Sequence, residues 1–176
     1  STEVNLRNNK IKFIKANCLI LKNVYSHDNK FLLEYPNLIV SLYFTNNLIE
    51  YIESGSFRLL NYLYNLDLSI NRLRILNERD FADLKILTNL NLSSNYLEII
   101  ERKVFDNLKN LVNLDLSFNL IREIDSFCFS SMKFLKDLHL NMNKMFLLEN
   151  STLFGLNSIR NIYLSEEILS DFIQVE

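Results

Sequence analysis

Residues 63–73 read Leu-Tyr-Asn-Leu-Asp-Leu-Ser-Ile-Asn-Arg-Leu, and the pattern of this stretch recurs along the chain. Counterparts of its asparagine occur every 24 residues, at Asn47, Asn71, Asn95, Asn119 and Asn143. Five residues before each asparagine stand Leu42, Leu66, Leu90, Leu114 and Leu138. A phenylalanine column has the same period, at Phe57, Phe81, Phe105 and Phe129. Columns that share one period indicate stacked structural repeats.

The repeat unit predicts a short strand followed by an inward turn. Leu66 and Leu68 alternate with Asp67, so a strand here points its leucines inward and Asp67 outward. At the end of the strand, each buried backbone group without a partner would cost about 1–3 kcal/mol. The Asn71 side chain can form hydrogen bonds with such groups, so asparagine can support the turn at a place where glycine or proline is more usual. The phenylalanines then fill the wider opposite side, which bends the stack and leaves the sheet on the concave face.

The pattern L-x-x-L-x-L-x-x-N-x-L of residues 63–73 resembles the leucine-rich repeat signature, and the resemblance extends from Ile39 to Phe172. A 24-residue unit with Phe in its second half resembles the typical class found in Toll and Toll-like receptor ectodomains and in secreted matrix proteins. The resemblance implies an α/β-type solenoid: a right-handed coil with a curved parallel β-sheet on the concave face and an irregular or short helical convex side. We expect a single domain, made of an irregular N-terminal repeat region (1–38), regular repeats (39–164) and a terminal turn or truncated end (165–176).

The N-terminal region leaves two registers open. A first match to the repeat lies 38 residues before the next asparagine of the column and comprises Val4, Leu6, Asn9, Ile11 and Ile14. A second, partial match fits the 24-residue phase and comprises Cys18, Ile20 and Asn23. Either the first repeat carries an insertion near residues 16–30, which we favour, or one match is accidental.

The C-terminal end shows one further strand before the pattern changes. Its apolar positions are Ile159, Ile162 and Leu164, continuing to Leu169 and Phe172. Glu167 stands in the asparagine position, and a carboxylate cannot donate as an amide does. We therefore expect a terminal or modified turn there, as end repeats often have.

The overall charge disfavours two classes of partner. The formal net charge is −2 with 23% charged residues, so no general field favours nucleic acid or an anionic membrane surface. No stretch reaches the roughly 18 uninterrupted apolar residues that cross a bilayer. Residues 1–10 also lack the apolar block of a signal peptide. We expect no nucleic-acid partner and no direct membrane insertion within this chain.

Cysteine and histidine placement argues against an enzyme or a metal site. Cys18 and Cys128 lie four to five coils apart, roughly 20 Å at strand spacing, too far for a disulfide. We expect Cys18 in the core in place of a leucine and Cys128 on the convex side, either exposed or buried; two free thiols favour a reducing compartment. His27 and His139 stand in different regions without partners at ligand spacing, so neither zinc nor a nucleophilic site is expected. No cofactor is expected.

Two aspartates on the predicted concave face could form a carboxylate pair. Asp67 and Asp115 occupy equivalent outward positions two strands apart, about 9.6 Å by strand spacing, at the upper limit of the range of an inverting glycosidase pair. An open sheet, however, gives no water-excluding pocket to shift a pKa. We therefore expect a binding surface here, without catalysis.

The outward strand positions form the candidate binding surface. The central row across successive strands is Tyr43, Asp67, Asn91, Asp115, His139 and Tyr163. We predict that a protein ligand docks here, with large groups as anchors and aspartates selecting a basic or amide-rich partner. A polar, solvated sheet without a ligand is the alternative. The predicted ligand-binding residues are Tyr43, Tyr64, Asp67, Asp115, Phe118, Asp137, His139, Met142 and Tyr163.

Two glycosylation sequons bear on the location of the protein. Asn91-Leu92-Ser93 lies on the predicted concave face, where a glycan would cover the binding surface, and is interpreted as a chance match. Asn150-Ser151-Thr152 lies off the strands, where a glycan would do no harm. The repeat class favours an extracellular receptor or adhesion ectodomain that binds a macromolecule. The free thiols and the missing cysteine-rich caps favour the alternative, a cytoplasmic scaffold or regulatory adaptor.

Overall fold

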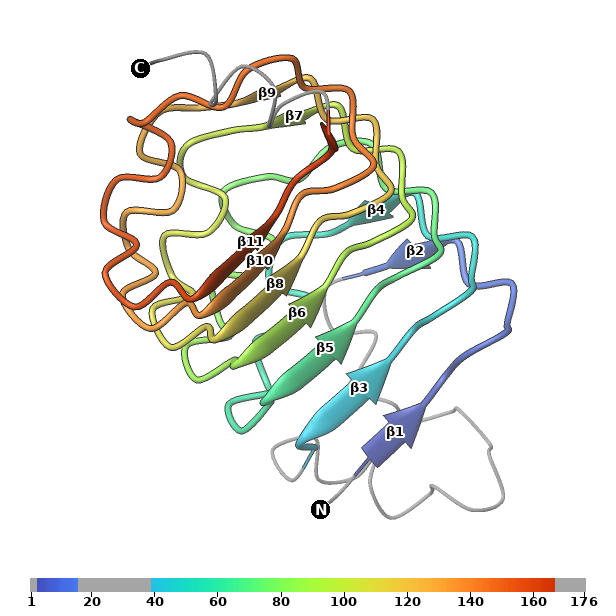
Figure 1. Ribbon diagram of the computed structural model, residues 1–176. Coiled ribbons are helices and arrows are strands. Elements are labelled where there is room, and N and C mark those ends of the chain that lie inside the picture. The colour runs from blue at the N-terminus through green and yellow to red at the C-terminus, as the bar shows by residue number, and fades with distance from the viewer. Residues whose placement is uncertain (1–2, 16–38, 167–176) are drawn as a thin grey trace, which may run out of the picture.

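The computed structural model describes residues 3–15 and 39–166, which form a solenoid of stacked coils (Figure 1). Seven strands form one parallel sheet along its length, in the order β1-β3-β5-β6-β8-β10-β11. These strands are β1 (Glu3–Asn5), β3 (Ser41–Tyr43), β5 (Asn65–Asp67), β6 (Asn89–Asn91), β8 (Asn113–Asp115), β10 (Asp137–His139) and β11 (Asn161–Tyr163). Two smaller parallel pairs are β2 (Phe13–Ile14) with β4 (Tyr51–Ile52) and β7 (Ile99–Ile100) with β9 (Glu123–Ile124).

The register of the large sheet follows the repeat. Leu66 lies opposite Leu90, and Leu90 lies opposite Leu114, so the inward leucines form a continuous buried column. The predicted parallel pairing of successive units is confirmed. At the N-terminal end Val4 lies opposite Leu42, 38 residues on along the chain. The partial match at Cys18, Ile20 and Asn23, and the C-terminal residues Glu167, Leu169 and Phe172, lie outside the described residues.

The column asparagines bond to backbone as predicted. Asn95 donates from Nδ2 to the carbonyl oxygens of Leu92 (3.0 Å) and Ser93 (3.3 Å) in its own coil and of Leu68 (3.0 Å) in the preceding one. Its Oδ1 accepts from the backbone N–H of Leu73 at 3.0 Å. Each such amide therefore closes its own turn and joins two coils.

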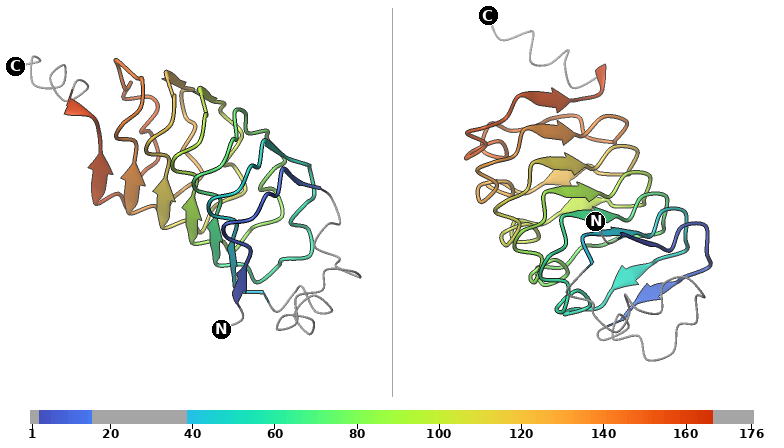
Figure 2. Two further views of the ribbon diagram at one scale, coloured as in Figure 1. Left: turned by 90° about the vertical axis from the view of Figure 1, so that its right-hand side faces the viewer. Right: turned by 90° about the horizontal axis from the view of Figure 1, so that it is seen from below.

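The phenylalanine column fills the convex side. Phe57, Phe81, Phe105 and Phe129 are buried and stack in order, with ring centroids 6.5, 6.4 and 6.1 Å apart. Parallel strands in a sheet lie only about 4.8 Å apart. The wider spacing on the phenylalanine side curves the stack toward the sheet, and Figure 2 shows the coils side by side along this arc.

The convex side consists of turns in the described parts of the chain, where the sequence allowed for short helices. Within residues 3–15 and 39–166 no helix has the length and apolar character to span a bilayer. The Cys128 side chain, whose exposure the sequence left open, is fully buried. It packs beside the phenylalanine column, with Sγ 3.5 Å from the carbonyl oxygen of Glu101.

A left-handed residue begins the turn after each of the strands β3, β5, β6, β8 and β10. The residue directly before the column asparagine has a φ of 54–56° in five successive coils, namely at Asn46, Ile70, Ser94, Phe118 and Met142. This conformation turns the chain out of the strand and directs the side chain to the surface. Phe118 and Met142 are 54% and 59% exposed there.

Candidate functional site

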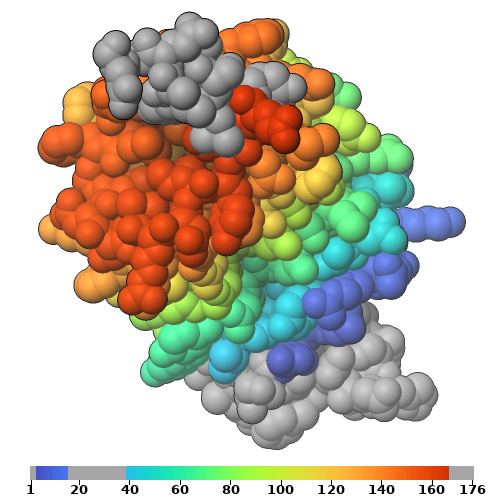
Figure 3. Space-filling view, in the orientation of Figure 1, coloured from blue at the N-terminus to red at the C-terminus, as the bar shows by residue number. Residues whose placement is uncertain are grey.

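The concave face of the large sheet forms an open groove of about 490 Å³. Its floor is backbone and outward side chains, because the leucines of the same strands point into the core. Figure 3 shows the coils as consecutive bands in contact, so the face runs without interruption from one coil to the next. The lining residues are Tyr43, Asn65, Leu66, Asp67, Asn89, Leu90, Asn91, Asn113, Leu114, Asp115, Asp137, His139 and Tyr163.

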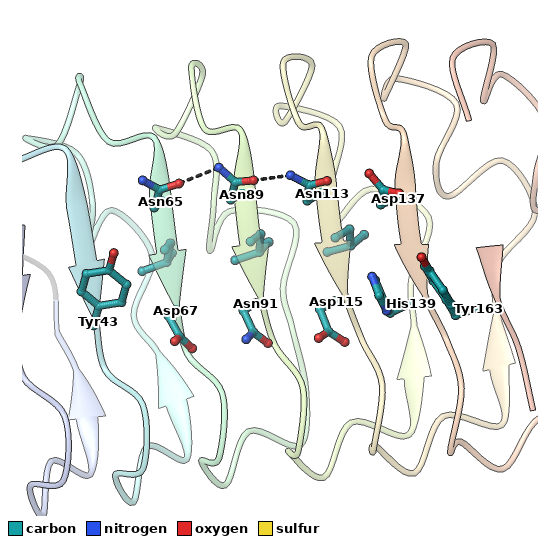
Figure 4. A pocket seen from close by; sticks show the side chains of 13 residues that line it. Tyr43, Asn65, Asp67, Asn89, Asn91, Asn113, Asp115, Asp137, His139 and Tyr163 are labelled. Atoms are coloured by element: carbon teal, nitrogen blue, oxygen red, sulfur yellow. Dashed lines mark hydrogen bonds between the residues drawn. The ribbon is translucent and has the colours of Figure 1, made fainter. Parts of the chain in front are cut away.

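The central row repeats one local arrangement. Asp115 Oδ1 accepts from the backbone N–H of Ser117 at 2.9 Å and from its hydroxyl at 2.6 Å. Asp67 with Ser69 and Asn91 with Ser93 form the same pair of hydrogen bonds. The serine row therefore holds the row of carboxylates and amide in a fixed orientation (Figure 4).

A ladder of amides lies beside the central row. Asn65 Nδ2 donates to Ser41 Oγ at 2.8 Å, Asn89 Nδ2 donates to Asn65 Oδ1 at 2.5 Å, and Asn113 Nδ2 donates to Asn89 Oδ1. The next residue in the row is Asp137, a carboxylate, which instead accepts from Asn161 Nδ2 at 2.6 Å. Figure 4 shows the hydrogen bonds joining the first three amides and the gap before Asp137.

A cation lies beside the N-terminal end of the groove. The Arg7 guanidinium lies over the Tyr43 ring, 3.8 Å from its centroid, and Nη2 is 4.0 Å from Asp67 Oδ2. Thr45 donates its hydroxyl to the same Asp67 oxygen at 2.7 Å. Sequence reasoning missed Arg7, because its place on this face becomes visible only when β1 is set in register with β3.

The C-terminal end of the groove contains aromatic rings. The His139 imidazole stacks on the Tyr163 ring, with centroids 4.1 Å apart and planes 13° apart. Tyr163 remains 44% exposed. These two side chains present a broad ring surface to solvent next to Asp115.

The predicted binding residues thus separate into two groups. Six line the groove: Tyr43, Asp67, Asp115, Asp137, His139 and Tyr163. Three lie outside its lining: Tyr64 directly before β5, and Phe118 and Met142 in the left-handed turns beyond β8 and β10. The structure therefore brings the aspartates and the ring pair together, while Phe118 and Met142 stand at the rim.

The groove has the chemistry of a contact surface. Asp67 and Asp115 are separated by β6 and lie in an open groove, and Arg7 is beside only one of them. In residues 3–15 and 39–166, no group of three or more His, Cys, Asp and Glu side chains could hold a metal ion. Hydrogen-bonding groups in fixed rows, flanked by rings, can recognise the surface of a partner.

The chain belongs to the leucine-rich repeat family, whose model matches residues 37–97, 61–121 and 109–167. Among solved structures it is similar to the receptor chain of the TLR13–ssRNA13 complex, with 29% identity and a TM-score of 0.79 over 93% of this chain. It is also similar to the Toll chain of the Drosophila Toll–Spatzle complex, with 32% identity and a TM-score of 0.69 over 76% of this chain. The chain spans about a fifth of the length of those chains, 21% and 20% respectively. No curated protein sequence matches it.

Proposed function

We propose that this chain is a recognition module of an extracellular or luminal receptor or adhesion ectodomain, and that it binds a protein on its concave face. The observation that carries the proposal is the groove over β3 to β11, in which fixed polar groups lie beside the half-buried rings of Tyr43 and His139 and the exposed ring of Tyr163. Rigid rings beside oriented hydrogen-bonding groups are typical of protein interfaces. The likeness to Toll-type chains supports the location and the receptor class.

The charge of the groove favours protein over nucleic acid. Three aspartates, Asp67, Asp115 and Asp137, line it, and none of the lining residues is lysine or arginine. Nucleic-acid binding depends on cations that neutralise phosphates. One of the similar structures is a complex with single-stranded RNA, yet the lining of this groove would repel a phosphate backbone.

Glycosylation can test the proposed location. Asn150 is exposed and lies outside the groove, so its sequon can carry a glycan without blocking the surface. Asn91 lines the groove. We propose that Asn150 is the glycosylated residue, and mass spectrometry of protein secreted from animal cells should find its glycan there. A glycan on Asn91 would place the binding surface elsewhere.

Site-specific crosslinking tests the function. A benzophenone side chain placed at Ser93, in the row beside the groove, should crosslink one protein from extracellular fluid, and excess unlabelled chain should compete. The matched control places it at Lys103, which is exposed and lies outside the groove. Equal crosslinking from both positions, or crosslinked nucleic acid in place of protein, would contradict the proposal.

A further inference from the structure

Arg7 shows how this face holds a guanidinium. Its Cζ lies 3.8 Å from the centroid of the Tyr43 ring, its Nε is 3.4 Å from Thr45 Oγ1, and Nη2 is 4.0 Å from Asp67 Oδ2. A ring face and a carboxylate on the next strand thus hold one cation between them. Both attractions are known to stabilise arginine at protein surfaces.

The central row repeats this arrangement in mirror order. From β3 to β10 it reads Tyr43, Asp67, Asn91, Asp115 and His139: ring, carboxylate, amide, carboxylate, ring (Figure 4). Tyr163 on β11 extends the second ring by stacking on His139. Asp115 with the His139–Tyr163 pair therefore corresponds to Asp67 with Tyr43.

Among the described residues, no cation of the chain lies beside the second half of the row. In residues 3–15 and 39–166, neither Asp115 nor Asp137 has a lysine or arginine nitrogen within 4.0 Å, whereas Asp67 has Arg7. Asp115 and Asp137 are diagonal neighbours on adjacent strands, with Cα atoms roughly 8 Å apart by sheet geometry. One guanidinium can reach both carboxylates across this separation, because it donates from two edges.

The broken amide ladder adds a third acceptor. Within the part of the chain that the structure describes, Asn113 Oδ1 accepts no hydrogen bond, because its neighbour in the row is the Asp137 carboxylate. Three acceptors therefore meet at this point of the groove, namely Asn113 Oδ1, the Asp115 carboxylate and the Asp137 carboxylate, which already accepts from Asn161 Nδ2. A planar group with several N–H donors complements such a set better than a compact ammonium.

We propose that the C-terminal half of the groove binds an arginine side chain of the protein partner. The guanidinium lies against the His139–Tyr163 rings and donates to Asp115, Asp137 and Asn113 Oδ1. This arginine pocket deepens the proposed function and rests on it. The occupant is an exposed arginine on a protein, since both the charge and the ring surface match it.

A set of matched peptides tests the pocket. The pentapeptide acetyl-Ser-Thr-Arg-Thr-Ser-amide is titrated into the full chain, and the ring signals of His139 and Tyr163 are followed by NMR. Citrulline in place of arginine keeps the shape and removes the charge, and lysine keeps the charge and removes the plane. We expect the citrulline peptide to bind at least about fivefold more weakly, and the lysine peptide to fall between the two.

Two variants localise the effect. Asp115→Asn and Asp137→Asn should each weaken the arginine peptide toward the affinity of the citrulline peptide. Asp115→Asn keeps the fold, because the amide can accept from Ser117 as Asn91 does from Ser93; an unchanged urea midpoint confirms this. Equal affinity of the arginine and citrulline peptides, or unchanged arginine affinity in both variants, would overturn the pocket.

Arg7→Gln gives the sharpest outcome, because it opens the mirror position. The number of arginine peptides bound should rise from one to two, and the Tyr43 ring signals should begin to shift. A stoichiometry that stays at one would overturn the correspondence between the two halves. If the chain shows no preference for the arginine peptide but still crosslinks to a protein from Ser93, the arginine pocket is wrong and the proposed function stands. If no protein crosslinks from Ser93, the proposed function is wrong.

Discussion

At the scale of single residues, Asn95 shows why an amide recurs in this chain. Its Nδ2 donates into two coils and its Oδ1 accepts from Leu73, and Asn71 and Asn119 repeat these contacts in their own coils. The side chain is almost fully buried. A hydroxyl of similar size has only one hydrogen to donate, whereas the amide offers two N–H donors together with a carbonyl acceptor.

The variant Asn95→Asp should destabilise the fold by about 3 kcal/mol, because the carboxylate cannot donate to Leu68 or Leu92 and carries a charge into the core. Urea unfolding measures the loss. The matched control is Asn91→Asp, which keeps an acceptor for Ser93 and should cost clearly less, because its charge stays at the surface and adds only repulsion from Asp67 and Asp115. A similar midpoint for both variants would contradict this role of the column.

The Cys128 thiol should be unreactive in the folded protein. Burial, together with the nearby charges of Asp125 and Asp106, raises its pKa from 9.0 to about 12, and only the thiolate attacks disulfide reagents. In a Cys18→Ser background, Ellman's reagent at pH 8 should label Cys128 only after denaturation. Rapid labelling of the native protein would contradict its burial.

The same pKa shift sets a pH dependence. Because the folded state holds the thiol proton more tightly than the unfolded state does, the contribution of Cys128 to stability is constant below pH 9 and falls above it. The stability difference between this protein and Cys128→Ala should therefore shrink as pH rises from 9 to 12.

At the scale of the elements, the turns after the strands show what sequence could and could not predict. The period-two leucines and the 24-residue asparagine column predicted the strands, their parallel pairing and the concave groove. The left-handed turns were not predicted, because Ile70 and Phe118 give no local signal for a positive φ that glycine or asparagine usually adopts. Arg7 was missed because its contacts with Tyr43 and Asp67 depend on the pairing of β1 with β3. The paired residues of these two strands lie 38 positions apart in the sequence.

The left-handed turn at Ile70 stores strain that substitution can remove. A β-branched residue at a φ of 54° costs about 1 kcal/mol relative to asparagine, and Asn46 occupies the same turn position in the preceding coil. Ile70 is exposed, so Ile70→Asn should raise the free energy of unfolding by about that amount. Ser94→Asn, at the next turn, should change it less. Destabilisation by Ile70→Asn would contradict the turn geometry.

Alanine variants of two glycines on the convex side can distinguish the cost of backbone strain from the cost of a steric clash. Gly55 has a φ of +76° and open space where a Cβ would stand, whereas a Cβ on Gly155, at a φ of +91°, would lie 2.9 Å from Ser130 Cα. Gly55→Ala should cost about 1 kcal/mol. Gly155→Ala should cost clearly more, because backbone must also move. Thermal unfolding compares the two, and equal losses would contradict the close approach of the coils.

At the scale of the whole molecule, each coil contacts mainly its neighbours, so a complete unit can be removed. Deleting residues 89–112 joins Thr88 to Asn113 and sets β5 beside β8 in the same register. This 24-residue deletion should fold cooperatively with a smaller denaturant m-value. Deleting residues 89–100 removes half a repeat unit, so the remaining strands no longer follow at 24-residue intervals. This deletion should abolish cooperative unfolding, as followed by circular dichroism.

The stacked phenylalanine column also affects how a partner can associate with this chain. The rings stacked from Phe57 to Phe129 pack these coils against one another, so we expect this part of the arc to keep its curvature when a partner binds. Encounter is then docking of rigid bodies, in which orientation limits the association rate and the lifetime of the complex sets most differences in affinity. The partner must bring a surface whose convexity already fits.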